Sequence, residues 1–497
     1  MPTLRVIVLT LLPGVAAGVA AWPILRNDFF ADDYLHLFEL ANFGPVDFIV
    51  SPYAGQMYLA RNAVFYLSYL AFGMRPAGYL GLALATHVAV SLLVGVVARR
   101  LTGNALVACL VGVLFAVSPA AHGTLGWYSV YGHALAALIT MLALLLVVPR
   151  HGDAGPLASG TAVVVAALAL AASQSFGTGA AVAIVLPVVV LLLRPATLRN
   201  RVSCAMLAAV PVLVLLAWAV ITGRRSRLNP FGLESTMAMV GLASDLRHVG
   251  LVAAHLSGMG IEGLLLGVPF QLVNHGDLLS RVTIVSLLVA VATAFLVGSG
   301  RVRRVLAAGL LAVATCYLVV AAGRGVLYVA LSRGQLIVHL ADTTRYHYLA
   351  QAWLAVVVAV TLDELGRHVP WRRAGGALLG IWIVWALASP VLLPPPGILG
   401  AAEAAQVTKV RQRLEQVVRS QPVGATVCLP IEPVGLLGVP GSLGVFVLYY
   451  PGEVLEGRRV RFVTLDPKLL ALRDAGGRAG RLVVLPDECP PQAEQHG

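Results

Sequence analysis

The chain has little charge for its length. Asp, Glu, Lys and Arg make up 12% of its 497 residues, whereas hydrophobic residues make up 59%. A soluble globular domain carries roughly 25% charged residues, so this composition excludes an ordinary soluble protein. The scarcity of charge indicates a polytopic membrane protein, in which any soluble segment must lie between or after the membrane spans.

The chain also lacks the common motifs of soluble enzymes. It contains no His-Glu-x-x-His, no Cys-x-x-Cys, no Gly-x-Ser-x-Gly and no glycine-rich loop followed by lysine. These absences argue against a zinc protease, a hydrolase with a nucleophile elbow and a P-loop enzyme. The 50 glycines are spread through apolar segments, where small residues let helices pack closely. The lack of a nucleotide loop fits a lipid-linked substrate.

Hydrophobic residues gather in blocks of roughly 17 to 25 residues, the length that crosses a bilayer as a helix. The first block could be a signal peptide, but its apolar run is longer than usual for one, so we interpret it as a helix. We predict about eleven spans, near residues 4–25, 78–98, 104–121, 132–149, 157–173, 177–193, 202–222, 282–298, 305–322, 347–365 and 374–392.

Arginine predicts the orientation of these spans, because positive charge in short loops stays in the cytoplasm. The arginine-rich short loops all fall on one side, around residues 99–100, 194–201, 301–304 and 367–373. We therefore predict an integral protein of a bacterial inner or plasma membrane with a cytoplasmic N-terminus. The opposite, external loops mix both charges with aromatic residues and histidines, and the first of them covers residues 26–77.

The composition changes after the run Pro394-Pro395-Pro396. An odd number of spans places the following residues outside the cytoplasm. Residues 406–421 have the pattern of an amphipathic helix, and short apolar runs at 426–429, 445–450, 461–464 and 482–485 have that of strands. The sequence therefore predicts a transmembrane module, 1–393, and a small external α/β domain, 394–497.

The five cysteines divide between these two parts. Cys109, Cys204 and Cys316 lie in predicted spans, whereas Cys428 and Cys489 each lie at the end of a predicted strand. Because an external compartment permits oxidation, Cys428 and Cys489 are a candidate disulfide, with two free thiols as the alternative.

The formal net charge of +12 could suggest a nucleic-acid partner. The cytoplasmic arginine loops account for most of this excess, since they orient the helices and face anionic lipid. We therefore expect membrane lipids as partners and no nucleic acid.

Two adjacent acids, Asp32 and Asp33, follow the first apolar run and precede Tyr34. An acidic pair beside a bilayer is costly to desolvate, which favours a chemical role over packing. One carboxylate of such a pair can act as a base, or both can hold a divalent cation against a phosphate. The alternatives are a helix cap and an ion pair with Arg26 or Arg61.

Two later external segments carry further candidates. Residues 118–128 include His122 and Trp127, and residues 342–349 include Arg345 and Tyr346. A fixed guanidinium can bind a lipid phosphate through two parallel hydrogen bonds and stabilise a leaving charge. The alternative for Arg345 is an interfacial arginine beside a tyrosine belt, and a lone histidine such as His122 is more often structural.

Together these features resemble the GT-C class of membrane glycosyltransferases, particularly the branch related to protein O-mannosyltransferases. The resemblance extends over many spans, an acidic motif in a long first external loop, the segment 72–79 followed by His87, and an Arg-Tyr element late in the chain. It implies a polyprenyl-phosphate-linked sugar, transfer outside the cytoplasm, and a first-loop acid at Asp32 or Asp33 that acts as base or metal ligand.

The chain departs from this class in its second external loop, where relatives carry a further acid. No Asp or Glu lies between His122 and His133. This departure puts the acid pair of the O-mannosyltransferase branch in doubt and leaves His122 as a polar substitute.

From these residues we expect direct, inverting transfer to a glycan, lipid or protein acceptor. Asp32 or Asp33 would deprotonate the acceptor, and Arg345 with Tyr346 would bind the donor phosphate. The cofactor is unknown, with a divalent metal ion on Asp32 and Asp33 as the candidate. The alternatives are a transporter or flippase for lipid-linked glycans and a non-catalytic assembly partner. Further substrate-binding candidates are Tyr34, His122, Trp127, His133, Arg224 and Arg225.

Overall fold

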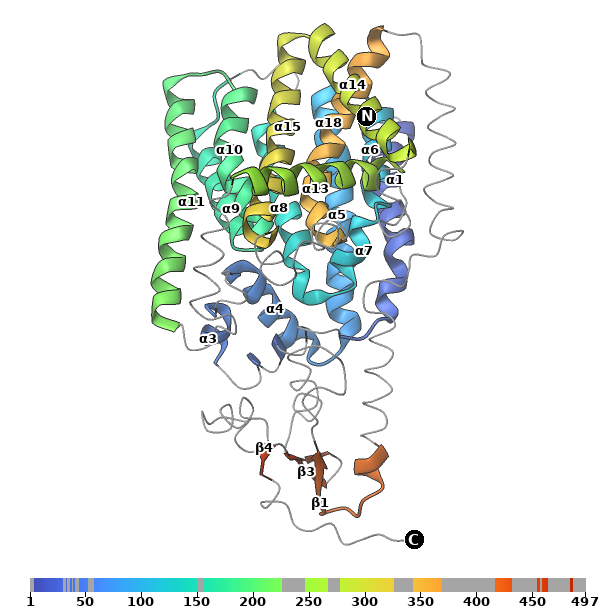
Figure 1. The fold of residues 1–497 in the computed structure, drawn as a ribbon, viewed down its shortest axis with the longest axis vertical. Coiled ribbons are helices and arrows are strands. Elements are labelled where there is room, and N and C mark those ends of the chain that lie inside the picture. The colour runs from blue at the N-terminus through green and yellow to red at the C-terminus, as the bar shows by residue number, and fades with distance from the viewer. Residues whose placement is uncertain are drawn as a thin grey trace.

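The computed structural model describes most of the helical part of the chain and short pieces of its C-terminal part. Within these residues, helices form a bundle, short helices of the first loop lie at one end of it, and a small sheet lies beyond that end (Figure 1). The described residues are 4–29, 33, 36–37, 39–40, 44–51, 58–149, 155–225, 246–266, 278–325, 343–368, 416–430, 454–455, 458–463 and 483–485.

Eight helical segments among the described residues are long and apolar enough to cross a membrane, as expected of an integral membrane protein. Their helices are α1 (Leu4–Ala21), α5 (Pro76–Thr102), α8 (Gly132–Val147), α11 (Leu198–Arg225), α13 (Leu246–Leu266), α14 (Leu278–Val297), α15 (Gly300–Val320) and α18 (Tyr348–His368). Three shorter apolar helices are α6 (Ala105–Ala116), α9 (Ser159–Ser173) and α10 (Ala180–Leu193).

Short helices connect or extend these segments. At the end of the bundle that carries the first loop, they are η1 (Trp22–Arg26), α3 (Pro45–Ile49), α4 (Leu59–Phe72), α7 (Ala120–Leu125), η2 (Tyr128–Val130), η3 (Gly177–Gly179), the π-helix η6 (Ala321–Gly325) and η7 (Thr344–His347).

Each predicted span that falls within the described residues coincides with a helix, and the predicted span 374–392 lies outside them. Between the predicted spans 202–222 and 282–298 we expected an external loop, residues 223–281. This prediction was wrong in part, because α13 occupies the middle of that segment. His255, Glu262 and several glycines interrupt its apolar run. The helix therefore lacks the continuous apolar block by which the other spans were predicted. Figure 1 shows α13 lying across the bundle rather than along it.

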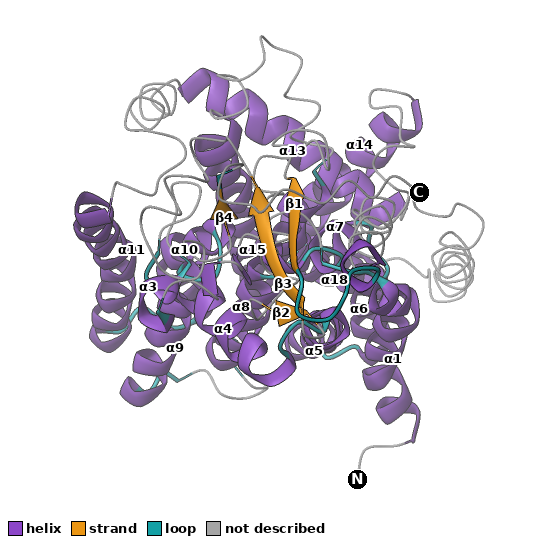
Figure 2. Ribbon diagram, turned by 90° about the horizontal axis from the view of Figure 1, so that it is seen from below, coloured by secondary structure: helices purple, strands orange, loops and turns teal. Residues whose placement is uncertain are grey.

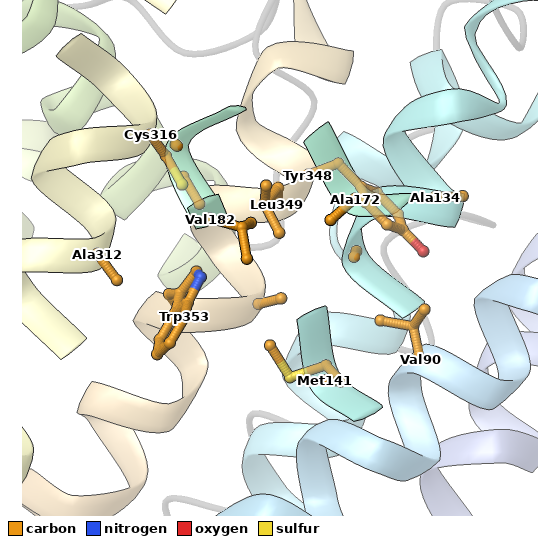
Figure 3. Packing of buried hydrophobic residues seen from close by; sticks show 14 of the residues in the cluster. Val90, Ala134, Met141, Ala172, Val182, Ala312, Cys316, Tyr348, Leu349 and Trp353 are labelled. Carbon is orange, nitrogen blue, oxygen red and sulfur yellow. The ribbon is translucent and has the colours of Figure 1, made fainter. Parts of the chain in front are cut away.

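α18 forms the centre of the bundle, and it is the most buried of the eight segments. Its first half is buried on every side and, apart from Gln351, almost wholly apolar, as expected for a helix with no face toward solvent. It packs against α5, α6, α8, α14 and α15, and Figure 3 shows Leu349 and Trp353 among core side chains from neighbouring helices. Its buried Gln351 accepts a hydrogen bond from Ser118 Oγ (2.5 Å) and donates one to the Gly260 carbonyl (3.0 Å).

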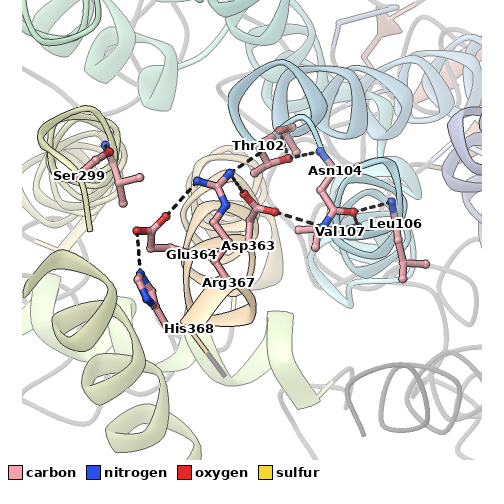
Figure 4. A network of polar contacts seen from close by, with 11 residues as sticks. Thr102, Asn104, Leu106, Val107, Ser299, Asp363, Glu364, Arg367 and His368 are labelled. Atoms are coloured by element: carbon pink, nitrogen blue, oxygen red, sulfur yellow. Dashed lines mark hydrogen bonds and ion pairs between the residues drawn. The ribbon is translucent and has the colours of Figure 1, made fainter. Parts of the chain in front are cut away.

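A polar network anchors the far end of α18, on the side that we predict to be cytoplasmic (Figure 4). Arg367 donates to Asp363 (2.6 Å) and Glu364 (3.4 Å), and Glu364 also meets His368 (3.5 Å). Asn104 caps α6 with its side-chain oxygen and donates from its amide nitrogen to Asp363 (3.2 Å). The network therefore ties α18 to the turn between α5 and α6.

The C-terminal part contains a small sheet, whose strands Figure 2 shows lengthwise in a view of the molecule from below. Its central strand, β3 (Arg458–Val463), pairs in parallel with β1 (Thr426–Pro430) and β4 (Val483–Val484) and antiparallel with β2 (Val454–Leu455). β1, β3 and β4 overlap predicted strands, whereas β2 was not predicted and the predicted strand 445–450 lies outside the described residues. Of the predicted helix 406–421, residues 416–419 are described and helical.

The cysteines follow the predicted division in part. Cys109, Cys204 and Cys316 are free and buried. Cys428 is disulfide-bonded, and its predicted partner Cys489 lies outside the described residues.

Close helix packing near the N-terminus depends on a glycine. A Cβ atom added at Gly112 of α6 would lie 2.6 Å from Cγ of Pro13 in α1 and 3.2 Å from the Ser91 carbonyl oxygen in α5. Three helices therefore approach at this point, as is common for small residues in membranes. Gly81 of α5 is different, because a Cβ atom there meets nothing within 4 Å.

We expect Gly112→Ala to destabilise the protein and Gly81→Ala to leave its stability unchanged or raised. Overpacking at Gly112 should lower the free energy of unfolding by about 1–3 kcal/mol, whereas alanine is the better helix former at an open position. Thermal unfolding in detergent, followed with a thiol-reactive dye that reaches the three buried cysteines only after unfolding, measures both variants. Equal unfolding temperatures for the two would contradict the packing described here.

Candidate functional site

The structure describes six of the predicted site residues with their side chains: Asp33, His122, Trp127, His133, Arg345 and Tyr346. Asp32 and Tyr34 lie outside the described residues. Arg224 and Arg225 end α11, but their side chains are also outside the description.

Asp33 is buried, with 1% of its surface exposed. Its Oδ1 accepts hydrogen bonds from the Ser129 N–H (2.5 Å) and the Ser129 hydroxyl (2.6 Å), and its Oδ2 accepts a longer one from the Tyr128 N–H (3.4 Å). Donors of this kind favour an ionised carboxylate. The loop after α1 is therefore bound through Asp33 to the loop between α6 and α8, a contact between residues far apart in the sequence.

Arg61 of α4 holds the other side of Ser129, and its side chain is also buried. Its Nη1 donates to the Ser129 carbonyl (2.9 Å) and to Nε2 of His36 (2.9 Å). Because a guanidinium has no acceptor, His36 must accept at Nε2. Its other nitrogen, Nδ1, then donates to the Glu39 carboxylate (3.0 Å). We call Asp33, Arg61 and Ser129 the Ser129 clamp.

The first turn of α4 also binds two other connections. The Ala60 N–H donates to the Gln174 carbonyl in the α9–η3 connection (3.1 Å). The buried Asn62 amide donates to carbonyl groups at the end of α3, of which Phe48 is the nearest (3.0 Å). Ala60, Arg61 and Asn62 are successive residues of α4. They bind the α9–η3 connection, η2 and the end of α3, so they fix these three segments relative to one another.

Arg345 lies in η7, directly before α18. Its guanidinium lies 5.0 Å from the ring centres of both Trp127 and Tyr346. Arg345 is half-buried, and its guanidinium forms no hydrogen bond or ion pair with any residue in the described part of the chain. Aromatic rings thus hold the guanidinium while its N–H groups are not engaged by described residues.

A glycine permits this placement of η7. The α7 helix packs against η7, and a Cβ atom added at Gly123 would collide with the Thr344 side chain and lie 3.3 Å from the Arg345 backbone nitrogen. The loop between α6 and α8 therefore touches Arg345 through Trp127 and Asp33 through Ser129. Since consecutive Cα atoms are 3.8 Å apart, the Cα atoms of Trp127 and Ser129 are at most about 7.6 Å apart.

Aromatic rings connect the two halves of the site. The His133 ring lies 5.9 Å from Tyr346 and 3.9 Å from Phe176. Phe176 stacks on Tyr58 at 5.0 Å, and the Arg61 guanidinium lies 4.7 Å from the Tyr58 ring. The predicted residues Trp127, His133, Arg345 and Tyr346 therefore belong to one assembly with Asp33.

Several residues of this assembly were not predicted from the sequence as site residues. Ser129, His36 and Gln174 carry no motif, and their roles depend on contacts with distant segments. Arg61 was considered only as an ion-pair partner of the aspartates. Its one detectable signal was a charge inside an apolar helix, between Ala60 and Asn62.

His122 of α7 is half-buried, and its imidazole makes no hydrogen bond with the described residues. Burial lowers the pKa of its imidazole from 6.5 to about 4, so this side chain is neutral at pH 7. A neutral imidazole can accept a proton or a hydrogen bond, which is compatible with the polar role predicted for it.

No group of three or more His, Cys, Asp or Glu side chains with metal-binding geometry occurs among the described residues. Within this part of the chain, Asp33 already uses its carboxylate oxygens on Ser129 and Tyr128. The metal ion expected on Asp32 and Asp33 stays a prediction, because Asp32 lies outside the described residues.

Comparisons with known proteins add little. No protein-family model and no curated protein matches the chain. Among solved structures, it is similar to the crystal structure of ArnT from Cupriavidus metallidurans bound to undecaprenyl phosphate, with a TM-score of 0.42 and 13% sequence identity over 98% of this chain and 90% of that one. A TM-score of 0.42 does not establish a shared fold.

The lowered pKa of His122 predicts a pH dependence of stability. On acidification the unfolded chain takes up a proton on this side chain near pH 6.5, whereas the folded protein does so only near pH 4. Stability should therefore fall between these values as the pH is lowered. We expect the unfolding temperature to drop more between about pH 7.5 and about pH 5 in the wild type than in His122→Gln. Equal drops would show that His122 titrates alike in both states.

Proposed function

We propose that this protein is a membrane glycosyltransferase of the GT-C class, which moves a sugar from a polyprenyl-phosphate-linked donor to an acceptor outside the cytoplasm. The observation that carries this proposal is the guanidinium of Arg345, held between Trp127 and Tyr346 and close to the segment that binds Asp33. A phosphate-binding cation and a carboxylate motif thus share one external site.

Arg345 suits the phosphate of the donor. A guanidinium presents planar, paired N–H donors that match phosphate oxygens, and stacking on aromatic faces keeps it oriented without using those donors. Because η7 leads directly into the buried helix α18, the position of Arg345 is fixed by the core of the bundle.

The donor's lipid fits the exposed surface of the bundle. α1, α11 and α14 expose many large hydrophobic side chains, including Leu11, Leu215 and Leu288. In a membrane protein such faces contact lipid. A polyprenyl chain can therefore remain in the bilayer while its phosphate reaches the external end of the helices.

The reaction that we propose is a single displacement. Asp32 or Asp33 removes the proton of an acceptor hydroxyl, whose oxygen then bonds to the anomeric carbon of the sugar. The bond from that carbon to the phosphate oxygen breaks, and its electron pair leaves with the polyprenyl phosphate. Arg345 stabilises the charge on this leaving group. One displacement inverts the anomeric configuration.

A non-catalytic partner that binds a lipid-linked glycan is the second candidate. The observation that favours it is the burial of Asp33, whose carboxylate is bound to Ser129 and Tyr128 as a structural residue would be. Such a protein would bind the donor at Arg345 without transferring the sugar.

The test is incubation of the purified protein in lipid with a panel of radiolabelled polyprenyl-phosphate sugars, with and without divalent metal ions. We expect the wild type to release or transfer sugar, and Asp32→Asn or Asp33→Asn to lose about 100-fold or more in rate. Donor binding without turnover would favour the non-catalytic partner. Full activity in a folded double variant would remove the aspartates from the mechanism.

We expect Arg345→Gln to weaken binding of a polyprenyl phosphate by about 10- to 100-fold, because a charge-assisted contact contributes about 1.5–3 kcal/mol. Arg75→Gln is the matched control, since Arg75 is an exposed arginine in the turn between α4 and α5. Equilibrium binding of radiolabelled polyprenyl phosphate to protein in nanodiscs measures both. Equal losses in the two variants would indicate general attraction by surface charge.

A further inference from the structure

We propose that Arg61 is a positioning residue of this site: acting through Ser129 and His36, it determines where the Asp33 carboxylate lies. This inference rests on the proposed function and extends it to a residue that neither the acidic motif nor the phosphate site includes.

The contacts of Ser129 supply the first step. Its N–H and hydroxyl bind Asp33, and its carbonyl oxygen binds Arg61. These groups belong to one buried residue, which lies in the short helix η2. A shift of Ser129 away from Arg61 must therefore move the donors that hold Asp33.

His36 supplies the second step, because Arg61 also holds the segment from which Asp33 comes. His36 lies three residues after Asp33 and accepts from the same Nη1 atom that binds Ser129. Its ring packs against those of Phe48 and Phe65, with centroids 6.0 Å and 5.6 Å away. Arg61 thus contacts both the residue that Asp33 binds and the turn that carries Asp33.

The burial of Arg61 supplies the third step. Only 1% of its surface is exposed, and a charge so buried costs more than an apolar side chain of the same size would. If only packing mattered, a methionine side chain could fill the same space. A guanidinium at this position makes sense where its fixed donors have to hold two acceptors in a defined geometry.

The experiment is a double-mutant cycle of Arg61 and Asp33, with rates measured per folded, donor-binding molecule. In the wild-type background, Arg61→Met should lower kcat by about 100-fold, as expected for a misplaced reacting group. In the Asp33→Asn background, it should change kcat by less than about twofold, because its effect passes through Asp33. Donor affinity should stay unchanged, since Arg345 is untouched.

Two further variants separate positioning from folding. Arg61→Lys keeps a charge and should restore part of the lost kcat. Arg194→Met is the matched control, because Arg194 is another buried arginine that donates to the Val147 carbonyl (2.8 Å), at the opposite end of α8. It should lower the unfolding temperature and leave kcat per folded molecule unchanged.

The outcomes distinguish this inference from the proposed function. An effect of Arg61→Met that is equally large in both backgrounds, or a loss of donor affinity, would overturn the positioning role while leaving the glycosyltransferase in place. Failure of both Arg61→Met and Arg61→Lys to fold would also overturn it, since Arg61 would then serve the fold. No sugar transfer by the wild type would instead refute the proposed function itself.

Discussion

The end of the bundle that carries the first loop depends on two buried charges, which bind the same residue, Ser129. Asp33 and Arg61 are both almost fully buried, and each binds a different backbone group of Ser129. A buried carboxylate or guanidinium is tolerated only where hydrogen bonds replace its water. Ser129 in the second loop supplies bonds to both charges, and His36 in the first loop supplies another to Arg61. The first loop, the second loop and α4 therefore have to come together for these bonds to form. This mutual dependence arranges the candidate site.

The half of the candidate site that contains Arg345 depends on a different constraint, the packing of α18. This helix is apolar on nearly every side and fills the centre of the bundle, and the Asp363–Arg367 network ties its far end to the turn between α5 and α6. Arg345 lies directly before this helix, so the packing of the core fixes its position next to Trp127. The site therefore joins one residue fixed by the hydrophobic core to another fixed by buried polar bonds.

Much of the fold could be predicted because a bilayer imposes a simple rule on the sequence. Apolar blocks of spanning length gave the correct places of α1, α5, α8 and α18, among others. The rule failed at α13, where His255, Glu262 and glycines interrupt the apolar run and the helix lies across the bundle. The site residues Arg345, Tyr346, Trp127 and His133 were predicted from residue type and loop position, and their contacts with one another were not.

The sequence by itself determined that this is a helical membrane protein with acids and aromatic residues in segments between spans, and it predicted Asp32, Asp33 and Arg345 as site residues. It determined these points because hydropathy and residue chemistry are local properties. Only the tertiary structure decided that Asp33 binds Ser129, that Arg61 holds the opposite side of the same residue, and that Trp127 and Tyr346 hold Arg345. These contacts join segments up to hundreds of residues apart. Their partners are set by which segments the packed helices bring together, and the sequence alone does not show this.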